Sequence, residues 1–119
     1  MIETVVKKSR FLGYAARIDS EEGAKKYIDE ISRQHKKARH VAFAYVAPGA
    51  ARCGDDGEPR GTAGLPLLSS LQRRSLENAV VVVVRYFGGV LLGKGGLIRA
   101  YGKAAGAALE EMLAEETGQ

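Results

Sequence analysis

Two short stretches of the sequence gather residue types that could do chemistry. In the first, three carboxylates fall within four positions, Asp55, Asp56 and Glu58, with the hydroxyl of Thr62 close behind. Clustered carboxylates can hold a divalent ion or orient a proton transfer. However, the spacing lacks the twelve-residue ligand ladder of a calcium loop, and Asp-Gly ahead of Pro59 is also typical of an ordinary turn. We call residues 55–62 the acidic loop. Its carboxylates can form a binding or catalytic site, or they can simply stabilise a turn, and the sequence leaves both alternatives open.

The second stretch, residues 88–96, is rich in glycine and is called the glycine turn below. Backbone amides at the start of a helix can hold a phosphate or carboxylate group, but a tight turn would require the same glycines. A nucleotide phosphate loop is not complete, because Gly95 stands where a Ser or Thr hydroxyl would hold magnesium, and the dinucleotide pattern also fails. The candidate anion-binding or partner-binding residues are Arg85, Tyr86, Gly88, Gly89, Gly93, Lys94, Gly95, Gly96 and Arg99.

The other reactive side chains are isolated in the sequence. His35 and His40 have no acidic partner at a metal-ligand spacing, so structural roles are favoured for both. Cys53 is the only cysteine, which excludes an internal disulfide, and no specific partner that would activate its thiol is evident. We therefore assign no catalytic residue, no metal site and no cofactor.

A buried central strand must position the glycine turn. Val80–Val84 are five consecutive β-branched residues, a pattern typical of a strand that is covered on both faces. The chain then passes through the glycine turn into a helix at about residues 95–115. Arg85 leaves the carboxyl end of the strand, and Arg99 lies about one turn inside the helix. We expect both, with Lys94, to face the acidic loop and form one surface with it.

Hydrophobic periodicity predicts the remaining elements. Ser20 offers a side-chain oxygen as a helix N-cap, and Pro66 suits the first turn of a later helix. The expected elements are paired strands at 3–6 and 11–18, a helix from 21 to about 35, a strand at 40–47, a long loop at 48–64 and a helix at 65–76.

Composition limits the domain count and the class of partner. A chain of 119 residues that is 45% hydrophobic can form one domain with a real core. It has no signal peptide pattern and no apolar run long enough for a membrane span, so we expect a cytoplasmic protein with no membrane partner. The net charge is +4, and a basic body of this kind attracts phosphate polymers or an acidic protein surface. All 18 Lys and Arg residues precede the acidic tail formed by Glu110, Glu111, Glu115 and Glu116.

Five sequence blocks occur in a recognisable order: Asp56–Pro59, Gly61–Gly64, Val83–Gly89, Leu92-Gly93 and Gly95–Tyr101. Together they resemble the signature of the Impact N-terminal domain family, which includes bacterial YigZ. The resemblance implies an α+β fold like domain 2 of ribosomal protein S5, with about four strands in a mixed sheet and about three helices largely on one face. Dimer packing or the N-terminal segment would then have to cover the other face of the central strand.

The resemblance also implies a function in translation. Eukaryotic members resemble regulators that bind the activator of the general-control kinase, and bacterial members commonly carry a further ferredoxin-like domain. Here we expect a single domain at 1–119 without the ferredoxin-like domain. We expect a non-enzymatic binding module with a protein or RNA partner from the translation apparatus, and a homodimer is a further expectation.

The alternative is an enzyme that acts on a phosphorylated or acidic substrate where the acidic loop and the glycine turn meet. An enzyme should show a concave pocket that joins these two segments. A binding module should show a broad basic face or an exposed apolar patch.

Overall fold

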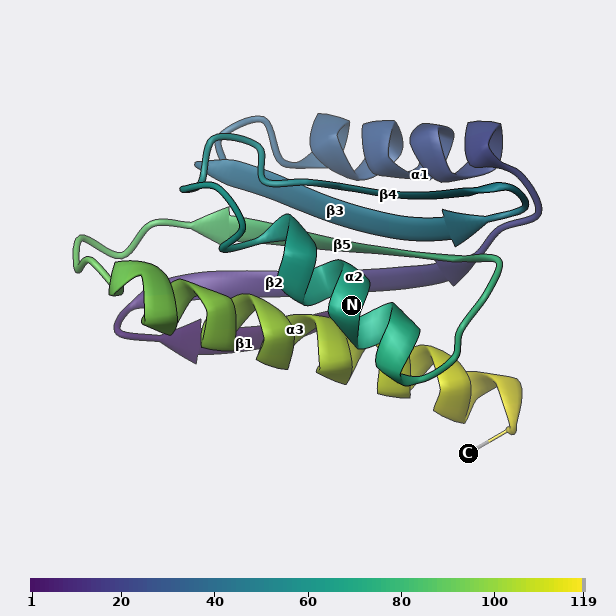
Figure 1. Cartoon of the computed structure of the whole chain (residues 1–119). Coiled ribbons are helices and arrows are strands. Elements are labelled where there is room, and N and C mark those ends of the chain that lie inside the picture. The colour runs from purple at the N-terminus through teal and green to yellow at the C-terminus, as the bar shows by residue number, and fades with distance from the viewer. Residues whose placement is uncertain (119) are drawn as a thin grey trace.

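The computed structural model, which describes residues 1–118, contains a five-stranded antiparallel sheet between helices (Figure 1). The strand order is β1-β2-β5-β3-β4, and every neighbouring pair is antiparallel. The expected α+β class is confirmed, but the sheet has five strands rather than about four and is not mixed. The elements are β1 (Ile2–Val6), β2 (Ser9–Arg17), α1 (Glu21–Gln34), β3 (His40–Ala47), β4 (Ala50–Gly54), α2 (Gly64–Arg73), β5 (Ala79–Tyr86) and α3 (Gly93–Glu116).

The additional strand, β4, lies inside the segment that the sequence predicts to be one long loop. It pairs with β3, so that Ala50 lies opposite Ala47 and Gly54 lies opposite Phe43. Its residues are small or polar and partly exposed, so no alternating apolar pattern marks it. Because β4 ends at Gly54 and α2 begins at Gly64, both ends of the acidic loop are anchored in regular structure.

The central strand β5 is buried on both faces, as expected. Val81 and Val83 belong to a core that includes residues of α2 and α3, whereas Val80, Val82 and Val84 belong to a second core that includes residues of α1. Figure 1 shows α1 on one side of the sheet and the other two helices on the opposite side. Two of the three helices therefore share a face, and α1 covers the other one. This removes the reason for expecting a dimer partner or the N-terminal segment to do so.

The helices follow the apolar periodicities of the sequence. The Ser20 hydroxyl accepts a hydrogen bond from the Gly23 N–H at 3.0 Å and caps α1, which buries Ala24 and Ile31. Within residues 1–118, no helix is both long enough and apolar enough to cross a membrane.

Strand register brings the segments of the candidate site to one end of the molecule. In the antiparallel pair β3–β5, His40 at the start of β3 lies opposite Arg85 near the end of β5. The helix α3 begins next to this end and packs against β2, where a Cβ on Gly13 would lie 2.8 Å from the carbonyl oxygen of Ala104. Only glycine permits such a close approach of helix and strand.

Candidate functional site

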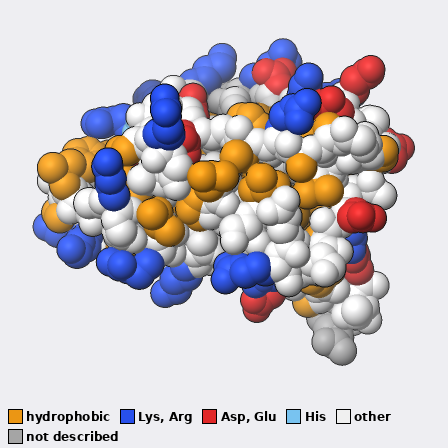
Figure 2. Space-filling model, in the orientation of Figure 1, with side chains coloured by type: hydrophobic (Ala, Val, Ile, Leu, Met, Phe, Trp, Pro, Cys, Tyr) orange, Lys and Arg blue, Asp and Glu red, His pale blue; other side chains and the backbone are white. Residues whose placement is uncertain are grey.

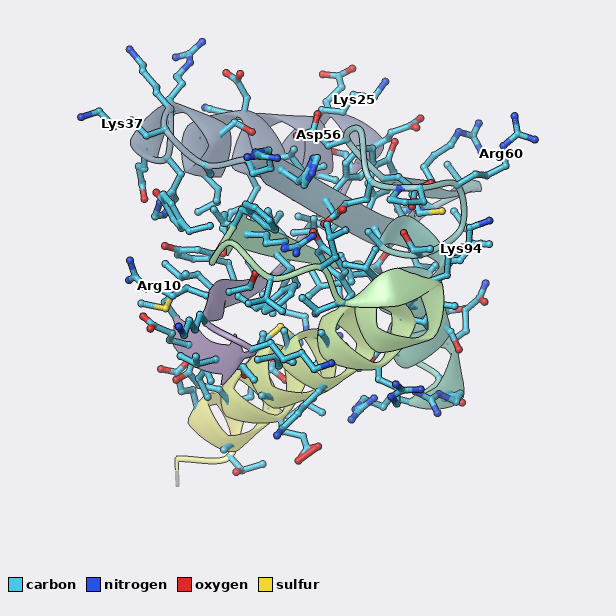
Figure 3. All side chains as sticks on the ribbon, turned by 90° about the vertical axis from the view of Figure 1, so that its left-hand side faces the viewer. Arg10, Lys25, Lys37, Asp56, Arg60 and Lys94 are labelled. Atoms are coloured by element: carbon cyan, nitrogen blue, oxygen red, sulfur yellow. The ribbon has the colours of Figure 1, made fainter. Side chains whose placement is uncertain are left out.

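The acidic loop and the glycine turn meet at a cavity of about 430 Å³. Gly57, Glu58 and Pro59 line one side of it, and residues 91–94 line the other. Figure 3 looks onto this end of the molecule, with Asp56 on the loop and Lys94 near the start of α3. The structure therefore contains the concave pocket that joins the two segments singled out in the sequence. We call it the main cavity.

A buried ion pair forms the base of the main cavity. Nη1 of Arg85 lies 2.8 Å from Oε2 of Glu58, and the two side chains are 6% and 3% exposed. The hydroxyl of Tyr101, from α3, donates a hydrogen bond to the same carboxylate oxygen. Burial, and then this hydrogen bond, raise the pKa of Tyr101 well above its usual value. The hydroxyl of Ser9 accepts from the Arg85 guanidinium at 3.3 Å, so the arginine also has a partner in β2.

His40 links the same carboxylate to the acidic loop. Its Nδ1 lies 2.7 Å from the carbonyl oxygen of Asp56, and because a carbonyl can only accept, Nδ1 carries a proton and donates it. Its Nε2 lies 3.4 Å from Oε1 of Glu58. The two oxygens of Glu58 thus face three side chains, Arg85, Tyr101 and His40.

The other two carboxylates of the acidic loop are held by backbone N–H groups. Asp55 accepts from Gly61, Ala63 and Gly64 at 3.0, 3.1 and 2.8 Å. Burial would raise the pKa of Asp55, but these three N–H groups outweigh it and hold the pKa below its usual value. These hydrogen bonds from the backbone fit the turn-stabilising role that the sequence left open for Asp55.

Asp56 likewise accepts from the N–H of Val41, at 2.7 Å. The hydroxyl of Thr62 is buried and donates to the carbonyl of Pro59, and Thr62 does not itself line the main cavity. The three carboxylates therefore point to three different sets of partners. Within residues 1–118, no group of three or more His, Cys, Asp or Glu side chains is arranged to hold a metal ion.

Geometry explains several residues of the glycine turn. A Cβ on Gly88 would lie 2.1 Å from the backbone carbon of Lys8, so glycine is required where the turn crosses the β1–β2 hairpin. Gly89 and Gly93 have φ angles of 87° and 73°, a conformation that favours glycine. Of these three, only Gly93 lines the main cavity. Gly95, in the first turn of α3, does not line it either.

Two of the predicted cationic and aromatic candidates lie elsewhere. Tyr86 follows Arg85 along β5, so its side chain points to the opposite face of the sheet, where its hydroxyl lies 2.7 Å from Nδ1 of His35. Lys94 and Arg99 are five residues apart, about 140° around the helix axis. Lys94 lines the main cavity, whereas Arg99 and Gly96 line a neighbouring cavity that shares Leu92 with it.

Residues that were not among the candidate binding residues complete the main cavity. The guanidinium of Arg39 lies over the ring of Phe87, 4.7 Å from its centroid, and both residues line the cavity. Leu91, at the tip of the glycine turn, is 83% exposed. His40 also belongs here. Arg39 and His40 lie next to Arg85 because β3 pairs with β5, and no local pattern in the sequence signals that register.

Existing contacts and burial limit the chemistry of several side chains in this arrangement. Glu58 is already engaged by Arg85 and Tyr101, so it is not a free general base. Burial, and then the nearby Asp55, raise the pKa of Cys53, which disfavours the reactive thiolate. The mouth offers two cations, Arg39 and Lys94, beside an apolar lining, so it suits a ligand that has both an acidic group and an apolar part.

This fold and site define a small α+β domain with a polar, ion-paired cavity at one end of its sheet. A family model described as the Impact N-terminal domain matches residues 7–109. The chain belongs to the Impact N-terminal domain family.

Two bacterial relatives illustrate the match. IMPACT family member YvyE of Bacillus subtilis is 45% identical over 113 residues, which cover 92% of this chain and 52% of the relative. IMPACT family member YigZ of Escherichia coli is 42% identical over 115 residues, which cover 92% of this chain and 56% of the relative. The chain therefore spans about half the length of the curated relatives that it matches.

Solved structures show the same domain. One, described as the crystal structure of a hypothetical protein, superposes with a TM-score of 0.89 at 40% identity and covers 93% of this chain and 56% of its own. A second, described as the two-domain translational regulator Yih1, superposes with a TM-score of 0.53 at 26% identity. That match covers 89% of this chain and 45% of Yih1.

Proposed function

We propose that this domain is a cytoplasmic binding module that acts in the regulation of translation by holding a segment of a partner protein in the main cavity. The observation that carries the proposal is the lining of that cavity, where an exposed leucine lies beside two cations that form no salt bridge with any described residue. Leu91 is 83% exposed at its rim, and Arg39 and Lys94 line its mouth. Membership of the family and the likeness to the translational regulator Yih1 support the link to translation.

The chemistry of the cavity favours a partner segment with an acidic residue next to an apolar one. The acidic side chain would meet Arg39 or Lys94, and the apolar one would pack against Phe87 and Leu91. Glu58 adds a negative charge at the base, but Arg85 pairs with it there. Exposed apolar side chains next to a concave site are typical of protein-binding surfaces.

The test compares the unchanged protein with two double variants in a pull-down from cell extract, followed by binding measurements on each purified candidate. Leu91→Ser with Lys94→Gln alters the main cavity, and Leu65→Ser with Arg73→Gln makes the same types of change on α2, where Leu65 is 55% exposed. We expect a translation protein that still binds after nuclease treatment, and we expect the cavity variant alone to weaken its binding by at least about tenfold. Equal loss in both variants, or binding that nuclease abolishes, would contradict the proposal.

An enzyme remains the second candidate because the cavity joins the acidic loop to the glycine turn, which is the arrangement expected of one. It would act on a phosphorylated or acidic substrate held by Arg39 and Lys94, with His40, which also lines the cavity, as the group that moves a proton. Release of inorganic phosphate from a panel of phosphorylated compounds would test this. Turnover that is lost in His40→Gln, with the fold retained, would favour the enzyme over the binding module.

A further inference from the structure

A second, smaller cavity with a cationic lining lies beside the main cavity. It has a volume of about 160 Å³ and shares only Leu92 with the main cavity. Lys7 reaches it from the turn between β1 and β2, and Arg99 and Lys103 reach it from successive turns of α3. Val6 adds an apolar wall. We call this site the basic hollow.

The cations of the basic hollow have no carboxylate to balance them. Among the described residues, Lys7, Arg99 and Lys103 form no salt bridge within 4.0 Å, whereas Arg10 and Arg17, on β2, each pair with a glutamate. Arg99 and Lys103 are four residues apart on a helix, a spacing at which like charges repel. An anion bound between them would relieve that repulsion.

Two glycines at the start of α3 keep the hollow open. Gly96 lines it, and a Cβ at that position would lie 3.2 Å from Cβ of Leu92. A Cβ on Gly95 would lie 3.3 Å from Nη1 of Arg99, so the guanidinium of Arg99 extends back along the helix over Gly95. Larger residues at 95 and 96 would displace the guanidinium or narrow the space.

The positive charge extends beyond the hollow. Lys8, next to Lys7 in the β1–β2 turn, and Lys94, at the start of α3, are both exposed. Figure 2 shows Lys and Arg side chains gathered over the lower left of the view, with no Asp or Glu side chain visible among them. Lys94 and Lys103 are nine residues apart, about 13 Å along the helix axis, which is longer than a single phosphate group.

We propose that the basic hollow and the lysines beside it bind the phosphate backbone of single-stranded RNA. Three cations around a compact hollow suit one phosphate group, and the wider row of cations suits its neighbours along a flexible strand. A protein segment would need apolar anchors, which lie mainly in the main cavity. Because the lining of the hollow contains no aromatic side chain on which a base could stack, binding should depend little on base sequence.

The test measures binding of a fluorescently labelled single-stranded oligouridine by anisotropy, at salt concentrations from about 50 mM to about 200 mM. The variant Lys7→Gln, Arg99→Gln, Lys103→Gln removes the charge of the hollow. The control variant Lys25→Gln, Lys36→Gln, Lys37→Gln removes the same charge from α1 and the turn that follows it, where all three lysines are exposed.

For the unchanged protein we expect log K to fall with log salt concentration with a slope of about −2, which corresponds to three phosphate contacts on a single strand. The hollow variant should bind at least about tenfold more weakly with a shallower slope, and the control should stay within about threefold. Thermal melting checks that both variants fold, and Lys103→Gln alone should show a smaller loss in the same direction.

Three results would overturn the proposal. They are undetectable binding of oligouridine by the unchanged protein, an equal loss of affinity in the control variant, and equally tight binding of poly-glutamate of the same charge. The last result would point to an acidic protein segment instead. Leu91→Ser alone alters the main cavity and leaves every cation of the proposed RNA-binding surface in place, so failure of one proposal can be told from failure of the other.

Discussion

Arg85 and Glu58 form an ion pair that is almost completely shielded from solvent, with 2.8 Å between Nη1 and Oε2. The pair connects the end of the central strand to the acidic loop, and Tyr101 adds α3 to the same carboxylate. Removal of one member of a buried pair leaves the other charge without compensation, which is costly. The stability of this end of the molecule should therefore depend on Glu58.

Replacement of Glu58 by Gln should lower the free energy of unfolding by about 3–5 kcal/mol, because Arg85 would keep its charge in a buried position. Denaturant unfolding, followed by circular dichroism, measures this. Glu3→Gln is the matched control, since Glu3 pairs with Arg10 at an exposed site and its loss should change stability little. If both variants unfolded at the same denaturant concentration, the buried pair would not support the fold in this way.

Replacement of Tyr101 by Phe should destabilise the protein by about 1–3 kcal/mol, because it removes one of the two hydrogen bonds to the buried oxygen Oε2 of Glu58. A double-mutant cycle with Glu58→Gln measures the coupling directly. We expect the two effects to be clearly less than additive, since Tyr101→Phe removes this hydrogen bond and Glu58→Gln replaces its charged acceptor with a weaker, neutral one. Strictly additive effects would mean that the hydroxyl and the carboxylate do not interact.

The N–H groups of Gly61, Ala63 and Gly64 should report the ionisation of Asp55. The pKa of Asp55 is lowered in the folded protein, so the stability it supplies is present above its unfolded value of 3.8 and is lost as the pH falls through the lower folded value. In nuclear magnetic resonance titrations, the three amide shifts should move together at a pH below 3.8, and Asp55→Asn should abolish this step. A shared step at or above 3.8 would be inconsistent with the hydrogen bonds described.

Protonation of His35 should destabilise the fold. Its two ring nitrogens each lie 2.7 Å from a tyrosine hydroxyl, of Tyr14 and Tyr86, and burial, with a smaller contribution from Arg10, lowers its pKa below 6.5. The folded state therefore binds the proton less well than the unfolded state, so stability decreases as the pH falls below about 6.5. Unfolding at about pH 7.5 and about pH 5.5 should show a larger loss for the unchanged protein than for His35→Gln. The same loss in both would exclude His35 as the cause.

The main elements of the fold could be predicted because each has a strong local signal. The valines of β5 show a strand buried on both faces, and Ser20 marks the start of α1. β4 could not be predicted, since residues 50–54 carry no alternating apolar pattern and form a strand only through pairing with β3. Which face α1 covers was also hidden, because an amphipathic pattern shows that a helix packs on a sheet but not on which side.

The candidate site was accessible to sequence reasoning only in part. Arg85 was a candidate because it ends the central strand, and Glu58 was a candidate because it belongs to a cluster of carboxylates. The structure places the two side chains in contact. Arg39 and His40 were missed because their position depends on the register of two strands that are distant in sequence. The sequence grouped Arg99 with Lys94, but the two positions are about 140° apart around α3 and line neighbouring cavities.

The position of β5 also constrains how the chain can fold during its synthesis. The strand lies between β2 and β3, yet it follows both in the sequence, and Gly13 pairs with Val83 across most of the chain. Until β5 leaves the ribosome, the β1–β2 and β3–β4 hairpins have no shared neighbour and expose the edges that it will cover. Pairings so distant in sequence slow folding, so the nascent chain should remain without a complete sheet until β5 (Ala79–Tyr86) has left the ribosome.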